Sequence, residues 1–327
     1  MSSDSSSDND DGLVIYTANE ILEKGLVLAR VSERSIQRRS QEKLAKNFVD
    51  RYGASHVVVA QIWEDLQITN IPQARLLPKD RKRISYFLMA MHFLKRYNVE
   101  SERALDYGLS EDTVRKWSWF FVEKIQALKA NKIKWPDHNY HDDVWILTVD
   151  GVHCWCEEPQ HPTLSRDPKY YSHKHNSAGY NYELGVAISE SRLIWMNGPF
   201  PAGLDDRSVF KTKGLRDKLV HLGKKAIADG GYHAREYANV LSTPNEIDDK
   251  RTKKFKSRAQ RRHEAFNGMI KTFRCLRDCF RHGEQRFKSC FEACCVIAQY
   301  QLENGQPLFE VYVRGLDDID EEIRVVL

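Results

Sequence analysis

Two aspartates stand where their side chains could share one chemical site. Asp150 ends the apolar run 144–149, Asp229 ends the shorter run 225–228, and a glycine follows each of them. Apolar runs of this kind predict strands that are buried on both faces. Because an isolated buried carboxylate is costly, an Asp at such a strand end has to be paired, capped or bound to a metal. If the two strands are neighbours, both carboxylates lie at one edge of the sheet.

A third acid, Glu264, lies on a helix predicted from about residue 257 onward. One face of this helix carries four residues at the spacing i, i+3, i+7 and i+10: Arg261, Glu264, Gly268 and Lys271. An ion pair between Glu264 and Arg261 is the simpler explanation, and if exposed it contributes only about a few tenths of a kcal/mol. That ion pair does not account for the two strands that end in Asp.

Carboxylates from two strand ends and a helix are the oxygen ligands that Mg²⁺, or Mn²⁺, binds. Two such ions about 4 Å apart activate a water or hydroxyl and stabilise the leaving oxygen in phosphodiester transfer. Between the strands, a loop rich in Pro and Gly leads to Asp205 and Asp206 at the start of a predicted helix. Capping of that helix is the alternative role for one of these two residues.

The charge distribution indicates a polyanionic partner. The net charge is +4, but residues 1–12 carry four Asp and residues 317–322 carry five acids, which leaves +4 + 9 = +13 on the rest of the chain. The run 250–262 holds eight Lys or Arg, directly before Glu264. Such residues, including Arg258, Arg261 and Arg262, are expected to bind a nucleic-acid backbone with salt-dependent affinity. A well-solvated surface is the alternative.

The elements that position these residues fall into two parts. Up to residue 128 apolar residues recur at helical spacing, and 84–97 is apolar nearly all round, as in the central helix of a bundle. Residues 129–143 lack periodicity and indicate a linker. The predicted segments are a disordered acidic tail (1–12), a helical domain (13–133), a mixed α/β domain (140–310) and an acidic C-terminal tail (311–327). Strands are predicted at 144–150, 180–189, 192–197 and 225–229.

Residues 101–121 have the outline of a helix-turn-helix. The segment contains a turn glycine, Gly108, and the helix-capping Ser110, followed by a helix that carries Arg115 and Lys116. In a DNA-binding unit of this kind the second helix enters the major groove, so these two cations would contact DNA. An ordinary helical hairpin with a basic outer face is the alternative.

Seven cysteines form no CxxC pair and no evenly spread framework, which favours reduced thiols. Cys275, Cys279 and His282 could bind zinc, although buried small side chains are the simpler interpretation. No apolar run approaches the roughly 20 residues of a membrane span, and the N-terminus lacks the apolar stretch of a signal peptide. We therefore expect a soluble intracellular protein.

Four motifs occur in order along the chain: TVDG, GPFPxGxxD, ADGGY and RRHExxNxxxK. Together with the helix-turn-helix outline, they resemble transposases of the Harbinger-like DDE group over roughly residues 85–310. The resemblance implies an RNase H-like nuclease domain, two Mg²⁺ or Mn²⁺ ions and double-stranded DNA as the substrate. It also implies a nuclear protein if the source is eukaryotic, a separate DNA-binding partner protein and a homo-oligomer on DNA.

Carried over to this sequence, the resemblance implies that Asp150 is the first metal ligand and Glu264 the last. The second ligand would be Asp229, with 34 residues between it and Glu264, while Asp206 matches a fourth acid that sits in the site or organises the loop. Lys271 is similar to a lysine that contacts DNA phosphate in related bacterial enzymes, although no tyrosine stands at the matching place.

The resulting hypothesis is a metal-dependent DNA endonuclease and strand transferase that cleaves transposon ends. One alternative is a domesticated transposase that binds DNA or acts as a scaffold without catalysis. A second alternative is a protein whose α/β half only presents an interaction surface.

Overall fold

The computed structural model describes residues 15–68, 83–136, 143–158, 167–212, 214–232, 234–244 and 248–311. The predicted tail 1–12 and all but the first residue of the predicted tail 311–327 lie outside these ranges. Within the described part no helix is long and apolar enough to cross a membrane.

All regular structure described before residue 136 is helical, as the apolar spacing predicts. The helices are α1 (Ala18–Leu28), α2 (Glu33–Arg38), α3 (Gln41–Tyr52), α4 (His56–Ile68), α5 (Arg83–Arg96), α6 (Glu100–Tyr107), α7 (Glu111–Ala127) and α8 (Lys129–Lys132). Helix α5 is buried on nearly every side and packs against α1, α3 and α7. The prediction of a central, all-round apolar helix at 84–97 is therefore confirmed.

A buried histidine on α5 makes the helical part sensitive to acid. Burial, with the nearby cations Arg51, Arg96 and Arg103, lowers the pKa of His92 from 6.5 to about 3. The unfolded chain therefore binds this proton near pH 6.5, whereas the folded chain does not. The stability from neutral His92 is present above pH 6.5 and is lost as the pH falls toward 3.

We expect His92→Gln to lose less stability between pH 6.5 and pH 4 than the parent protein. Thermal or urea unfolding across that range measures the effect. Identical acid dependence in the two proteins would contradict it.

Five strands form one continuous path in a mixed sheet, and a sixth, β4, pairs with β3. The strands are β1 (Trp145–Trp155), β2 (Tyr171–Ser172), β3 (Ser177–Ala187), β4 (Leu193–Pro201), β5 (Lys225–Ala228) and β6 (Leu241–Ser242). Strand β3 pairs antiparallel with β1, β2 and β4, whereas β5 lies parallel to both β1 and β6. The four predicted strands are present as β1, β3, β4 and β5, and the first three of them pair antiparallel.

Helices cover both faces of the sheet. They are α9 (Asp206–Thr212), α10 (Leu215–Leu222), α11 (Lys250–Ile270), α12 (Arg274–Arg277) and α13 (Glu284–Glu303). On one face α9 and α10 pack on β1 and β5 through a cluster that includes Phe210 and Leu219. On the other face lies α11, whose Phe255 and Ala259 contact Ile227. Helix α11 starts at Lys250, earlier than predicted, because Asp249 caps it.

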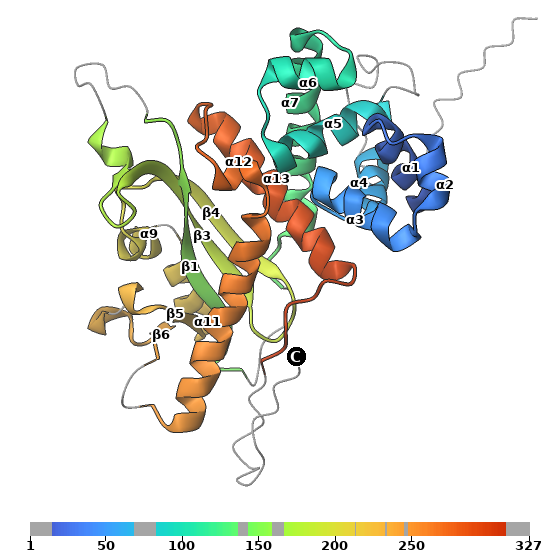
Figure 1. Ribbon diagram of the computed structural model, residues 1–327. Coiled ribbons are helices and arrows are strands. Elements are labelled where there is room, and N and C mark those ends of the chain that lie inside the picture. Colours follow the sequence, from blue (N-terminus) through green and yellow to red (C-terminus); the bar gives the residue numbers. More distant parts are fainter. Residues whose placement is uncertain are drawn as a thin grey trace, which may run out of the picture.

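Helix α13 joins the helical part to the sheet (Figure 1). It packs against α4, α7 and α8 on one side and against β4 and α11 on the other. One hydrophobic core therefore extends across the predicted domain boundary between residues 133 and 140. The stacked rings of Tyr97 and Phe280, 5.5 Å apart, and the 2.8 Å ion pair between Lys132 and Glu303 also cross it. The division into two domains remains a prediction.

Candidate active site

The parallel pairing of β1 and β5 brings the two aspartates side by side, although only Asp229 stands at a strand end. Strand β1 continues to Trp155, so the prediction that Asp150 ends its strand is wrong; the antiparallel pairing with β3 carries β1 past it. Val149 pairs with Ala228, so the next residues along the two strands are Asp150 and Asp229. Side chains alternate between the faces of a sheet. Thr148 points toward α11, where its hydroxyl lies 2.8 Å from His263 Nδ1, and two residues later Asp150 also points that way. Asp229 directly follows the last residue of β5, and its Oδ1 accepts from the Gly231 amide at 2.8 Å.

Two polar side chains attach α11 to β5 and to β1. Gln260 Nε2 donates to the carbonyl oxygen of Ala228 at 2.6 Å, and Asn267 Nδ2 donates to Asp150 Oδ2 at 3.1 Å. Glu264 stands four residues after Gln260 and three before Asn267, hence on the same face of the helix. It is exposed, and within the described ranges it forms no ion pair. Glu264 therefore lies between the two contacts that hold α11 against Asp150 and Asp229.

Helix α11 contacts the sheet through Gln260, Asn267 and Lys271. Of the four residues expected to share one face, Lys271 makes such a contact, whereas Arg261, Glu264 and Gly268 are exposed. The ion pair of Glu264 with Arg261, the simpler alternative for this helix, is not present in the described structure. Sequence reasoning missed Gln260 and Asn267, although the spacing i, i+4, i+7 and i+11 around Glu264 indicates them.

Negative charge is concentrated around Asp150. Burial, then the charge of Asp229 and then that of Asp206, raises the pKa of Asp150 to about 7. The amide of Gly151, which donates to Asp150 Oδ1 at 2.8 Å, opposes this shift only in part. Carboxylates held together in this way repel each other, and a bound cation would relieve the repulsion.

The aspartates of the loop before α9 have different roles. Asp205 caps the helix, since its carboxylate accepts from the Ser208 amide at 3.0 Å and from the Ser208 hydroxyl at 2.8 Å. Asp206 is three-quarters buried and lies against Gly151, where any Cβ would overlap with Asp206 Oδ1. Because Gly151 and Asp150 face opposite sides of the strand, Asp206 approaches from the side of the sheet opposite to α11.

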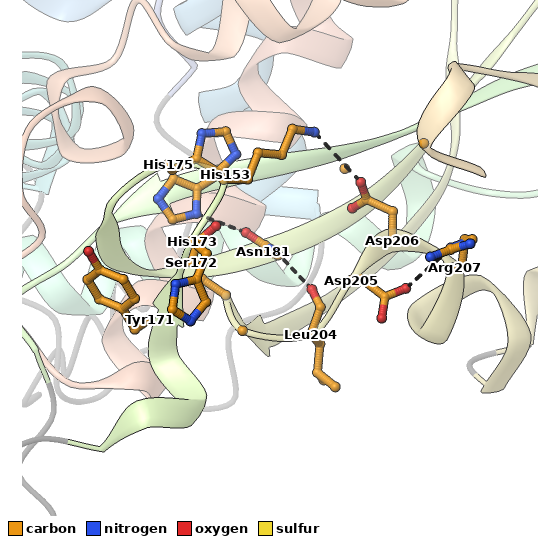
Figure 2. A pocket seen from close by; sticks show the side chains of 15 residues that line it. His153, Tyr171, Ser172, His173, His175, Asn181, Leu204, Asp205, Asp206 and Arg207 are labelled. Carbon is orange, nitrogen blue, oxygen red and sulfur yellow. Dashed lines mark hydrogen bonds and ion pairs between the residues drawn. The ribbon is translucent and has the colours of Figure 1, made fainter. Parts of the chain in front are cut away.

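A cavity of about 400 Å³ opens beside these acids (Figure 2). One end of the cavity is lined by Gly151, Asp206 and Gly231. The cavity therefore adjoins the middle of β1 and the turn that follows β5. At the other end it is lined by the imidazoles of His153, His173 and His175, which the sequence analysis did not single out. Their spacing in the sequence has no metal-binding pattern, so only the folded structure brings them to the acids.

The donor groups of the site are of the right kind for a metal ion but are not yet gathered around one point. Among the described residues, no group of three or more His, Cys, Asp or Glu is gathered closely enough to hold an ion. The donor chemistry of Asp150, Asp229 and Glu264 suits a hard divalent cation. Bringing them together as ligands requires movement of the exposed Glu264 side chain toward the two aspartates.

Comparison with known proteins bears on this site. Residues 149–299 match the family model of the DDE superfamily endonucleases. The matched segment begins one residue before Asp150, contains Asp206, Asp229 and Glu264, and ends within α13. Searches of curated proteins and of solved structures gave no match. The endonuclease match suggests a transposase-type nuclease, in agreement with the coarser part of the sequence hypothesis.

Two of the cations predicted to bind DNA, Arg262 and Lys271, turn toward the sheet and bond to backbone carbonyl oxygens. Arg262 is 3% exposed, and its guanidinium donates to the carbonyl oxygens of Ala187, Glu190 and Phe309. Lys271 donates to the carbonyl oxygens of His153 and Leu276. Both groups therefore hold the backbone in place and are not free to bind phosphate in this structure.

The other cations predicted on α11 are more accessible. Arg258 is half-buried, with its guanidinium 4.8 Å from the centre of the Phe309 ring. Arg261 is exposed. Three exposed residues of α11 fall on one stripe that leads to Glu264: Lys250, Lys254 and Arg261.

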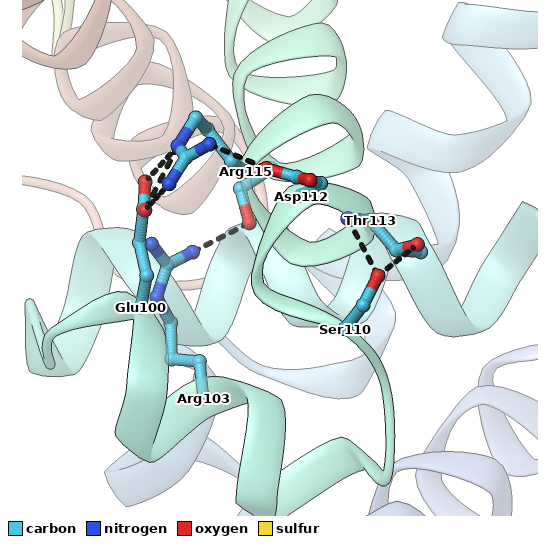
Figure 3. A network of polar contacts seen from close by, with 7 residues as sticks. Glu100, Arg103, Ser110, Asp112, Thr113 and Arg115 are labelled. Atoms are coloured by element: carbon cyan, nitrogen blue, oxygen red, sulfur yellow. Dashed lines mark hydrogen bonds and ion pairs between the residues drawn. The ribbon is translucent and has the colours of Figure 1, made fainter.

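The helix-turn-helix outline is present as local structure. Gly108 ends α6 with φ +62°, and Ser110 caps α7 by accepting from the Thr113 amide at 3.3 Å. Arg115, however, forms ion pairs with Glu100 at 2.5 Å and with Asp112 at 2.7 Å (Figure 3). A DNA phosphate would have to compete with both carboxylates. Lys116 is exposed, and DNA binding by α7 remains a prediction.

The residues considered for zinc are separated by packing. Cys275 is buried with its sulfur 3.6 Å from Cys294 Sγ, while the His282 ring lies edge-on to Trp119 at 5.1 Å. His282 thus occupies an aromatic cluster in the core shared with the helical part.

Proposed function

We propose that this protein is a metal-dependent DNA endonuclease whose site is formed by Asp150, Asp229 and Glu264. The observation that carries the proposal is the placement of two aspartates directly after the last pair of the parallel strands β1 and β5, with α11 attached across them on either side of Glu264. The match of residues 149–299 to an endonuclease family supports it. The sheet, with three antiparallel strands followed by two parallel ones, supports an RNase H-like fold.

Each residue has a specific task in this proposal. Asp150 and Asp229 would hold Mg²⁺ or Mn²⁺, with Glu264 completing the ligand set and Asp206 adding negative charge from the other side. Two such ions, when bound, supply an activated water and stabilisation of the leaving oxygen. Asn267 orients Asp150 through its 3.1 Å hydrogen bond, and His263 holds α11 against β1.

Double-stranded DNA would approach along the exposed stripe of α11. Lys250, Lys254 and Arg261 place positive charge along a path that ends at Glu264. Each phosphate contact of this kind adds to an affinity that falls as salt rises. Strand transfer at transposon ends, binding of those ends by α6 and α7, a partner protein, a homo-oligomer and a nuclear location are further parts of the proposal that rest on the Harbinger-like resemblance.

One observation favours a second candidate function. Because no group of three potential ligands is gathered in the described residues, the protein could instead be a DNA-binding or scaffold protein without catalysis. The two functions differ in whether the phosphodiester bond is broken.

Nicking of supercoiled plasmid separates the two candidates. We expect the full chain to convert supercoiled DNA to open circles with Mn²⁺ or Mg²⁺ and to stop when the metal is chelated. Retention of DNA on a gel without any nicking in either metal would rule out the endonuclease and favour the binding protein.

A further inference from the structure

Two stacked histidine rings, those of His153 and His175, line part of the cavity, and hydrogen bonds fix the orientation of the His153 ring. His153 Nδ1 donates to Asn181 Oδ1 at 3.0 Å, and the Ser177 hydroxyl lies 3.1 Å from Nε2, so the ring is held from both edges. The His175 ring stacks on it with centroids 4.3 Å apart and planes 11° apart. His175 itself is exposed. The pair therefore presents a flat, ordered ring surface to the cavity.

A second pair of rings lines the same cavity. Tyr171 and His173 meet edge to face, with centroids 5.3 Å apart, and His173 is exposed. Figure 2 shows these rings at one end of the cavity and the aspartates at the other.

Two cations at the rim are only loosely paired. Lys174 Nζ lies 4.0 Å from Asp206 Oδ2 and its side chain is 71% exposed. Arg207 Nε lies 3.9 Å from Asp205 Oδ1 and its side chain is 56% exposed. Long, solvated pairs of this kind contribute little, so either cation can turn to a phosphate without loss of a strong contact.

The chemistry of the cavity combines flat rings, an amide and two available cations next to a proposed phosphodiester site. Flat aromatic surfaces bind nucleobases by stacking, and side-chain amides hydrogen-bond to base edges. Asn181 Nδ2 lies 3.5 Å from the Leu204 carbonyl oxygen, a weak contact that a base could replace. The cavity of about 400 Å³ falls in the size range of small-ligand sites.

We propose that this cavity takes one unpaired nucleotide of the DNA strand, with its base stacked on His175 and its phosphate at Lys174 and Arg207. The nucleotide would lie across β1 from the phosphodiester held at Asp150, since Gly151 forms part of the cavity wall and faces the side of the sheet opposite to α11. This inference rests on the proposed endonuclease function. It adds that the site recognises a nucleotide that has left the base stack.

Fluorescence of a short single strand that contains 2-aminopurine tests the proposal with the full chain. We expect the parent protein to bind this strand and change its fluorescence, and His175→Ala to bind it about tenfold or more weakly, as loss of one base–aromatic stack predicts. His221→Ala, which removes an exposed histidine at the end of α10, is the matched control and should bind as the parent does. Thermal unfolding checks that both variants are folded.

Competitors and duplex DNA distinguish binding of a nucleotide in the cavity from binding of phosphate alone and from binding of duplex DNA on α11. A nucleoside monophosphate should displace the probe, whereas inorganic phosphate at the same concentration should not. Duplex binding should be the same in His175→Ala and in the parent, because the stripe on α11 is unchanged. Equal single-strand affinity in His175→Ala, His221→Ala and the parent would overturn the proposal.

Nicking provides the independent readout of the endonuclease. If plasmid nicking occurs but single-strand binding is independent of His175, the nucleotide site is wrong and the endonuclease stands. If His175-dependent single-strand binding occurs without nicking, the endonuclease is wrong and the nucleotide site stands as a binding site.

Discussion

Asp150→Asn should reduce metal-dependent nicking by about a thousandfold or more. Asp150 follows the residue that pairs with the end of β5 and accepts from Asn267 of α11, so its loss removes a ligand that the proposed ions need. Metal ions contribute several kcal/mol to stabilisation of the transition state, and each 1.36 kcal/mol corresponds to a tenfold change in rate. The rate of conversion of supercoiled plasmid, in Mn²⁺ and in Mg²⁺, measures the effect.

The same substitution should leave the fold intact and raise its stability slightly at neutral pH. Burial and the charges of Asp229 and Asp206 raise the pKa of Asp150 to about 7, which means that its ionised form is unfavourable in the folded protein. Asn retains the oxygen that accepts from the Gly151 amide but removes the repulsion. Higher stability with lost activity is the behaviour expected of a charged group kept for function.

Asp205→Asn is the matched control for loss of one carboxylate. Asp205 is 62% exposed and caps α9, and Asn caps helices about as well as Asp. We expect nicking close to that of the parent protein. Asp229→Asn should behave like Asp150→Asn, while Asp206→Asn should have a smaller effect because Asp206 approaches from the other face. Undiminished cleavage by Asp150→Asn would contradict the assignment.

Arg262→Met should destabilise the protein by about 3 kcal/mol or more. The Arg262 guanidinium is buried and donates to three carbonyl oxygens, those of Ala187, Glu190 and Phe309. Its removal takes this donor from all three acceptors, at about 1–3 kcal/mol for each group left unsatisfied, although the Glu190 oxygen still accepts from the Arg192 amide at 3.0 Å. The attachment of α11 to the end of β3 would weaken. Denaturant unfolding of the folded variant gives the change in free energy directly.

Arg261→Met is the matched variant on the adjacent, exposed position. It should leave stability within about 0.5 kcal/mol of the parent value, because Arg261 is exposed and forms no ion pair with the residues that the structure describes. It should instead weaken DNA binding and lower the salt slope of that binding by about one. Similar losses of stability in both variants, or normal stability in Arg262→Met, would contradict the assignment of Arg262 to stability and of Arg261 to DNA binding.

The sequence by itself determined which residues could form the site. Strands that lead to Asp150 and Asp229 follow from uninterrupted apolar runs, although β1 runs on to Trp155, and a helix that carries Glu264 follows from its composition and spacing. The central helix α5 and the cap at Ser110 were likewise predictable, because hydrophobic periodicity and capping depend on neighbours within a few residues. The order of motifs was enough to indicate the endonuclease family that residues 149–299 match.

Only the tertiary structure decided how α11 is rotated about its axis. Periodicity gives the spacing of residues on a helix but not which face is buried. That choice depends on partners far away in the sequence: Thr148 for His263, Ala187 for Arg262 and Asp150 for Asn267. This rotation of α11 directs Arg262 and Lys271 toward the sheet and leaves Arg261 exposed to solvent. Folding likewise brought His153 and His175 to the acids, since contacts across a sheet follow strand pairing, which no local pattern of residues encodes.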